Sequence, residues 1–230
     1  MKNATVTTIS RADFFESSVK PDLEEILSFC REHGIPFFYT ACVENSAEKG
    51  SVYVWNAVTP DSLGLSLRDD RIQNHICVAN GDEAVPSIGE DVEMGLKEEP
   101  FITRETETAE FDKKSCFEKE VHDRLRSLTA TCGIYKIPFF YTACVANTKN
   151  NSTEYVSDVV GPYGRELVLV DDRIARHIDV LLGFEIIHVR GDIGGNVMDL
   201  VDGDELEGLL DTLPDDGLFS GADDGTEEEF

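Results

Sequence analysis

The chain contains 230 residues and carries a formal net charge of −26 at pH 7, from 46 acidic and 20 basic residues. A surface this acidic repels phosphate groups, so we expect no direct binding to duplex nucleic acid. The first 25 residues lack the apolar stretch of a signal peptide, and no run approaches the roughly 18 apolar residues of a membrane span. These features predict a cytoplasmic protein without a membrane partner.

One sequence unit occurs twice. Residues 35–45 read IPFFYTACVEN and residues 137–147 read IPFFYTACVAN, with ten identities in eleven positions. A second pair, DDRIQNHICVANG and DDRIARHIDVLLG, begins at residues 69 and 171 and has the same offset of 102 residues. The equal offset predicts a tandem duplication, which leaves open whether the copies form one pseudo-symmetric body or two lobes.

The predicted organisation has four parts. They are repeat 1 over residues 1–83, an acidic linker over 84–112, repeat 2 over 113–190, and an acidic, partly disordered tail over 191–230.

Each repeat opens with an amphipathic helix, because its apolar residues recur at steps of three and four. In the first repeat these residues are Phe15, Val19, Leu23, Ile26, Leu27 and Cys30. Ser115 and Glu118 match the capping-box pattern in the second repeat. Pro21, which Asp123 replaces in the second repeat, predicts a kink or a restart in the first helix.

A strand follows Pro36 and, in the second repeat, Pro138. Both of its faces are largely apolar, so we expect it at the centre of a sheet. Further strands are predicted near residues 52–58 and 155–160. The alternating leucines at 63–67 and 167–169 predict a third short strand.

A second helix is predicted after each tandem aspartate, with Asp69 and Asp171 as N-caps. A fourth strand is expected at 184–189, whereas 82–87 is more polar and is interrupted by Pro86. The predicted fold class is therefore α+β, a duplicated α-β-β-β-α(-β) unit whose mostly antiparallel sheet is covered by helices.

The start of this second helix carries the recurring acid, base and histidine cluster. Its weak catalytic candidates are Asp70, His75, Asp172 and His177. They could transfer protons or bind a divalent metal, but a capped helix with an Asp–Arg pair and a half-buried histidine explains the same residues. We favour the second interpretation and expect no metal or cofactor.

The repeated strand offers another candidate, a cysteine nucleophile in a pocket. The residues concerned are Tyr39, Thr40, Cys42 and Asn45, with Tyr141, Thr142, Cys144 and Asn147. We favour a core strand, since cysteine and aromatic residues are commonly buried. The six cysteines have no zinc-site spacing, so we expect free, reduced thiols.

The tail holds 14 acidic residues and no lysine or arginine from residue 191 to 230. An amphipathic segment at 197–213 could form a helix that docks on this chain or on a partner. The last residues are candidates for partner binding: Asp223, Asp224, Glu227, Glu228, Glu229 and Phe230. This ending resembles the tips of bacterial and phage single-stranded-DNA-binding proteins, which implies docking in a basic pocket of a replication or repair enzyme.

We therefore expect a non-enzymatic acidic interaction protein, of a kind that phages and mobile elements encode. It would engage a basic, nucleic-acid-handling protein through electrostatic complementarity or nucleic-acid mimicry. Two alternatives stay open: a small enzyme or metal-binding protein that uses the Asp-Asp-Arg-x-x-x-His clusters, and a single-stranded-DNA-binding accessory factor. A purely solubilising charge, or adaptation to a high-salt cytoplasm, would also account for the acidity.

Overall fold

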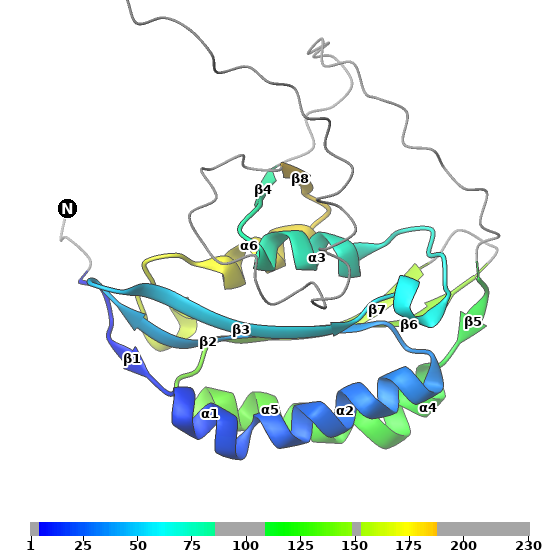
Figure 1. Ribbon diagram of the computed structural model, residues 1–230, viewed down its shortest axis with the longest axis horizontal. Coiled ribbons are helices and arrows are strands. Elements are labelled where there is room, and N and C mark those ends of the chain that lie inside the picture. Colours follow the sequence, from blue (N-terminus) through cyan, green and yellow to red (C-terminus); the bar gives the residue numbers. More distant parts are fainter. Residues whose placement is uncertain (1–4, 86–108, 149–152, 188–230) are drawn as a thin grey trace, which may run out of the picture. The chain divides into compact units, whose positions relative to one another are not determined.

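The computed structural model describes residues 5–85, 109–148 and 153–187 (Figure 1). The chain divides into two units, Met1–Val189 and Arg190–Phe230. The second unit lies outside the described residues, so the fold below is that of the first.

The elements of residues 9–85 recur in the same order in residues 111–187. The first set is β1 (Ile9–Ser10), α1 (Ala12–Ser18), α2 (Lys20–His33), β2 (Phe37–Ser46), β3 (Gly50–Val58), η1 (Asp61–Leu63), α3 (Arg71–Ala79) and β4 (Glu83–Val85). The second set is β5 (Phe111–Asp112), α4 (Lys114–Phe117), η2 (Glu118–His122), α5 (Asp123–Ile134), β6 (Phe139–Asn147), β7 (Thr153–Val160), η3 (Tyr163–Arg165), α6 (Arg173–Leu181) and β8 (Glu185–Ile187).

The described residues form a mixed α/β fold. Its main sheet has six strands, and all of their pairings are antiparallel. β2 and β6 lie side by side at the centre, and β3 and β7 flank them. The β2–β6 register is symmetric about the Tyr39–Tyr141 pair, with Phe37 opposite Ala143 and Ala41 opposite Phe139. The two halves therefore share one continuous sheet.

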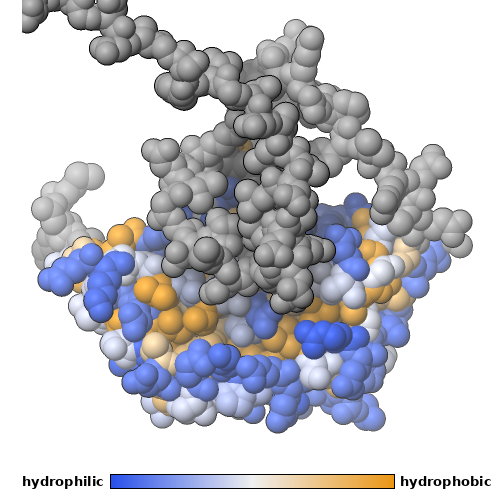
Figure 2. Space-filling view, in the orientation of Figure 1, coloured by the Kyte–Doolittle hydropathy of each residue, from blue (hydrophilic) through white to orange (hydrophobic). Residues whose placement is uncertain are grey.

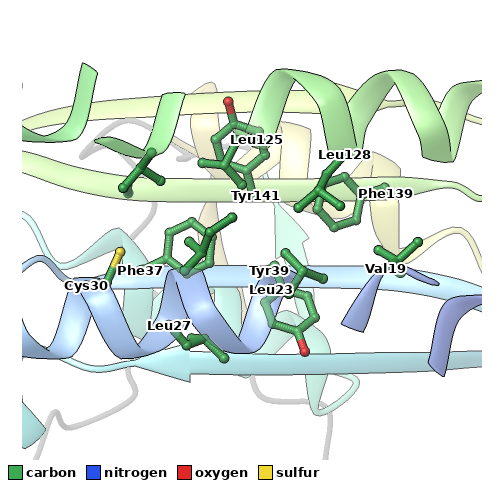
Figure 3. Close-up of a cluster of buried hydrophobic side chains, with 14 of the residues drawn as sticks. Val19, Leu23, Leu27, Cys30, Phe37, Tyr39, Leu125, Leu128, Phe139 and Tyr141 are labelled. Carbon is green, nitrogen blue, oxygen red and sulfur yellow. The ribbon is translucent and has the colours of Figure 1, made fainter. Parts of the chain in front are cut away.

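Helices cover both faces of this sheet (Figure 1). α1, α2, α4 and α5 lie on one face, and α3 and α6 lie on the other. On the first face, aromatic side chains of β2 and β6 pack against aliphatic side chains of α2 and α5 (Figure 3). Phe37, Phe139, Leu23 and Leu125 are fully buried there, and burial of each such side chain contributes about 1.5–3 kcal/mol. The prediction of a central strand with two covered faces is confirmed.

The outer strand β3 is more exposed than the central strand β2, and its Val52 is 40% exposed. Figure 2 shows a band of apolar residues across the middle of the visible face, where β3 crosses in Figure 1. On this strand the amide of Ala57 bonds to the side chain of Asn56 (2.8 Å), and on β7 the amide of Val159 bonds to Asp158 (2.8 Å). In each of these outer strands, one backbone amide is thus bonded to the side chain of the preceding residue. That amide is not available for a hydrogen bond to a further strand, which disfavours edge-to-edge association.

The first long helix restarts where the proline predicted it. α1 ends at Ser18 and α2 begins at Lys20, with Pro21 in its first turn. In the second half, where Asp123 replaces the proline, the helix continues through the π-helical turn η2. The predicted restart is confirmed, and proline fits there because the first-turn amide needs no helical partner.

The predicted capping box is wrong. Lys113 is the N-cap of α4 and makes no side-chain cap bond, and Ser115 lies inside the helix. Asp112 instead accepts a hydrogen bond from the amide of Lys114 (3.1 Å). The helix thus begins two residues earlier than the pattern indicated.

The predicted third strand is also wrong. Residues 63–67 and 167–169 contain no strand, and Leu63 is the last residue of the short helix η1. The carbonyl of Val168 instead accepts bonds from the Thr7 amide (2.9 Å) and the Asn45 side chain (3.1 Å). These side-chain and isolated backbone bonds replace the regular ladder that alternating leucines suggested.

The ends of both halves pair with each other. β4 and β8 form a separate antiparallel two-stranded sheet, with Ala84 opposite Ile186. The strand expected near residue 184 is present, and the more polar 82–87 segment also contributes a strand. β4 and β5 lie at the two ends of the segment that the sequence marked as a linker. None of the helices in the described ranges has the length and apolar character needed to cross a membrane.

Candidate functional site

The two histidines of the repeated cluster meet at the junction of the halves. His75 lies on α3 and His177 on α6, and their Nδ1 atoms are 3.1 Å apart. Neither side chain has solvent-exposed surface. The sequence suggested a half-buried histidine near each helix start, whereas the fold brings both rings together in the core.

Two phenylalanines of the central strands enclose the histidine pair. The ring centroid of Phe38 lies 5.6 Å from that of His75, and the centroid of Phe140 lies 5.1 Å from that of His177. The Phe140 and His177 rings are nearly parallel, with 7° between their planes. This apolar enclosure provides no opposite charge for a protonated imidazole.

Burial therefore keeps both histidines neutral. It lowers the pKa of His75 to about 3, and the Arg71 charge adds to the effect. The pKa of His177 is also lowered well below its usual value of 6.5, first by burial and then by His75, Arg173 and Arg176. Because a neutral imidazole carries one N–H, one ring donates in the Nδ1–Nδ1 hydrogen bond and the other accepts.

This bond makes the two rings chemically different. The donor is the Nδ1–H tautomer, and the acceptor must carry its proton on Nε2. Both Nε2 atoms are buried without a hydrogen-bond partner among the described residues. Proton exchange with a substrate would require α3 or α6 to move away from the sheet, since neither ring reaches solvent.

The aspartates at these helix starts have structural roles. Asp70 accepts a hydrogen bond from the Gln73 amide (3.1 Å), and Asp172 accepts one from the Ala175 amide (3.0 Å). These two are the N-caps, so the prediction of Asp69 and Asp171 was wrong by one residue. Burial is the main cause that raises the pKa of Asp70 and Asp172.

The preceding aspartates pair with the arginines instead. Asp69 lies 2.7 Å from Nε of Arg71, and Asp171 lies 2.8 Å from Nε of Arg173. The expected Asp–Arg pair is present in both halves. It orients each guanidinium toward the other half, where Arg71 Nη1 donates to the Leu181 carbonyl (3.1 Å) and Arg173 donates to the Ala79 carbonyl.

One tyrosine from the opposite half is hydrogen-bonded to each of these helix starts. The Tyr53 hydroxyl donates to the Asp171 carbonyl (2.7 Å) and accepts from the Arg173 amide (3.1 Å). Tyr155 makes the same bonds to residues 69 and 71, at 2.6 and 3.1 Å. Sequence reasoning missed this role, although both tyrosines recur at the 102-residue offset and that recurrence was the available signal.

The asparagine that ends each central-strand motif also bridges the halves. Asn45 Nδ2 donates to the carbonyls of Thr7 and Val168, and its Oδ1 accepts from Ser51 and the Val170 amide. In the second half, Asn147 Nδ2 donates to the carbonyls of Ser66 and Ala109. The asparagine therefore belongs to the fold contacts rather than to an open pocket.

The candidate nucleophiles are buried thiols. Burial is the main cause that raises the pKa of Cys42 and Cys144 to about 12. Tyr39 and Tyr141 are buried as well, on the opposite face of the sheet. The interpretation of this segment as a core strand is confirmed, and the cysteines of the described residues are free.

Within residues 5–85, 109–148 and 153–187, no three histidine, cysteine or acidic side chains are grouped closely enough to hold a metal ion. The candidate partner-binding residues lie outside the described residues. These are Asp223, Asp224, Glu227, Glu228, Glu229 and Phe230. The expected amphipathic segment at 197–213 also lies outside them.

The chain was compared with known proteins in three ways. No protein-family model matches it, and the searches of curated proteins and of solved structures found no significant match.

Proposed function

We propose that this protein is an acidic interaction protein, built on a duplicated scaffold, that engages a basic partner protein. The observation that carries the proposal is the uneven charge, since residues 191–230 contain 14 acidic residues and no lysine or arginine. A dense negative segment attracts a basic surface and speeds its association through long-range electrostatics. A nucleic-acid-handling protein suits this role, because its binding surface is made to receive negative phosphates.

The arrangement of the repeated residues supports the scaffold part of the proposal. Tyr53, Tyr155, Asn45 and Asn147 each bond to the other half of the chain. A duplicated unit that once paired with its own copy would keep such reciprocal contacts after fusion. The recurring residues therefore serve assembly of the scaffold, and the charge remains for recognition.

The proposed setting is the cytoplasm, in a system such as a phage or another mobile element. The enzyme or metal-binding alternative and the single-stranded-DNA accessory factor stay hypotheses. No contact among the described residues favours either one.

The proposal can be tested by affinity capture from an extract of the source organism. The full chain is one bait, and the matched bait carries asparagine or glutamine in place of the 14 acids of residues 191–230. We expect the native bait to retain a specific basic protein, the neutralised bait to lose it, and retention to fall steeply as salt rises.

Capture of the same proteins by both baits would contradict the proposal. Retention that does not change with salt would also contradict it, because electrostatic association must weaken when charges are screened.

A further inference from the structure

One end of the sheet carries an open pocket of about 460 Å³. β1, the start of α1, the bulge in β2 and the end of α5 form its walls, and its lining includes Arg11, Asp13, Phe14, Glu44 and Tyr135. A smaller hollow of about 200 Å³ shares Glu44 with it. The larger volume falls within the range of roughly 300–1,000 Å³ that is typical of ligand pockets.

The apolar wall of this pocket is a stacked aromatic pair. The ring centroids of Phe14 and Tyr135 are 3.9 Å apart, with 26° between the planes. Tyr135 remains 44% exposed, and the adjacent Ile134 is 77% exposed. An exposed aromatic beside an exposed aliphatic residue is the kind of surface that anchors protein partners.

The polar side of the pocket has two available carboxylates. Among the described residues, no hydrogen bond or ion pair engages the side chains of Asp13 or Glu44. Arg11 lines the pocket as well; its Nε donates to the Tyr135 carbonyl (3.1 Å) and its Nη1 to the Ser10 carbonyl (2.9 Å), and among the described residues it forms no ion pair with either acid. Two acids and an aromatic wall thus face the same hollow.

The other half of the chain does not repeat this chemistry. At the 102-residue offset, Asp13 corresponds to Ser115, Phe14 to Cys116, Glu44 to Ala146 and Tyr135 to His33. Tyr53 and Asn45, which bond the halves together, are in contrast repeated as Tyr155 and Asn147. The two acids of the pocket therefore do not belong to the repeated contacts between the halves, whereas Tyr135 also contacts Phe14 and Arg11 of the other half.

We propose that this pocket receives a lysine or arginine side chain of the basic partner. The aliphatic stem would pack on Phe14 and Tyr135, as long basic side chains do on apolar surfaces. The cationic head would lie near the carboxylates of Asp13 and Glu44 and the aromatic faces, which attract it through charge and cation–π interactions. This inference rests on the proposed function and adds a specific contact on the folded body.

The test is an NMR titration of the full chain with N-acetyl-arginine methylamide, a monovalent probe that gains no avidity from the acidic tail. We expect saturable amide shifts at Phe14, Ile134 and Tyr135. The double variant Asp13→Asn/Glu44→Gln should bind roughly three- to tenfold more weakly, as expected for loss of exposed ion pairs.

A matched control removes the same charge elsewhere. Asp22→Asn/Glu48→Gln changes two exposed acids that do not line the pocket, and it should leave the affinity unchanged. Tyr135→Ala should weaken binding, whereas Tyr163→Ala, at a 79% exposed tyrosine, should not.

Equal weakening by the two double variants would overturn the inference, as would shifts confined to residues 191–230. If either of these results is found but the native chain still captures a basic protein in a salt-dependent way, only the pocket inference is overturned and the proposed function is retained. Failure of both experiments would remove both proposals.

Discussion

At the residue scale, side chains that looked like chemical candidates serve as contacts of the fold. Asp70 caps α3 and His75 contacts His177, whereas Tyr53, which the sequence analysis did not single out, holds the start of α6. The repeated cluster combined an acid, a base and a histidine, which is also what a capped helix with an ion pair contains. A catalytic cluster and a capped helix can contain the same residue types at the same spacing. Only the burial of these side chains and their contact partners distinguish the two.

Tyr53→Phe should destabilise the protein by about 1–3 kcal/mol. The change leaves the part-buried Asp171 carbonyl and Arg173 amide without this partner, and an unsatisfied polar group in the interior costs up to about that much. Urea unfolding measures the effect. Tyr163→Phe, at an exposed tyrosine, is the control and should change stability by less than about 0.5 kcal/mol; equal effects would contradict the proposed lock.

The histidine pair should make the fold sensitive to acid. Both rings are neutral when folded and can be protonated when unfolded, so their contribution to stability is complete above pH 6.5 and is lost as the pH falls toward the folded-state pKa, about 3 for His75. Each histidine adds a slope of up to about 1.4 kcal/mol per pH unit in that window. The raised pKa values of Asp70 and Asp172 act in the opposite direction.

The double variant His75→Leu/His177→Leu isolates the histidine contribution. We expect its unfolding free energy to vary less between pH 6.5 and 4 than that of the native chain, in urea titrations at a series of pH values. His33→Leu, at an exposed histidine, should keep the native slope. An unchanged slope in the double variant would show that the pair is not the acid-sensitive group.

At the element scale, the first long helix is interrupted in one half of the chain and continuous in the other. The first half breaks it between α1 and α2 and places Pro21 in the new first turn. The second half passes the same point through η2 without a proline. The local sequence predicted the break because proline restricts its own backbone. No sequence pattern near residues 118–122 predicted the π-helical turn.

This difference predicts opposite responses to proline exchange. Pro21→Ala should change stability by less than about 1 kcal/mol, since proline is tolerated in a first turn and acts mainly on the unfolded chain. Asp123→Pro should cost about 3 kcal/mol or more, because it removes an amide from a continuous helix. Thermal and urea unfolding measure both changes, and a cost for Asp123→Pro as small as that for Pro21→Ala would contradict the prediction.

The element boundaries show where local patterns fail. Leu63 and its alternating neighbours predicted a strand, but their backbone partners are isolated groups such as the Ala109 amide, which bonds to the Ser66 carbonyl. β1 and β5 are two residues each, too short for any periodicity to reveal. The long strand β2, in contrast, was predictable because both of its faces are apolar.

At the scale of the whole molecule, the shared sheet joins the halves into one body. β2 pairs with β6, and the locks of Tyr53, Tyr155, Asn45 and Asn147 cross the same boundary. Neither half keeps its partners if the other unfolds. The described body should therefore unfold in one cooperative step.

A change in the second half should consequently be felt in the first. Phe140→Ala removes a fully buried ring of β6 and should cost about 3–5 kcal/mol. The chain has a single tryptophan, Trp55, which lies on β3 in the first half. Its fluorescence and the far-ultraviolet circular dichroism should shift to the same lower urea midpoint; an unmoved tryptophan transition would show two independent lobes.

The sequence by itself determined the repeated unit, the central strand, the helix restart at Pro21 and the helix starts near the tandem aspartates. Each depends on residues close together in the chain, whose backbone preferences and apolar spacing act locally. Only the tertiary structure decided that His75 contacts His177, that Tyr53 holds residues 171 and 173, and that the aromatics and acids of the pocket meet. Those contacts join distant segments, and they follow from the antiparallel register of β2 and β6, which no local pattern specifies.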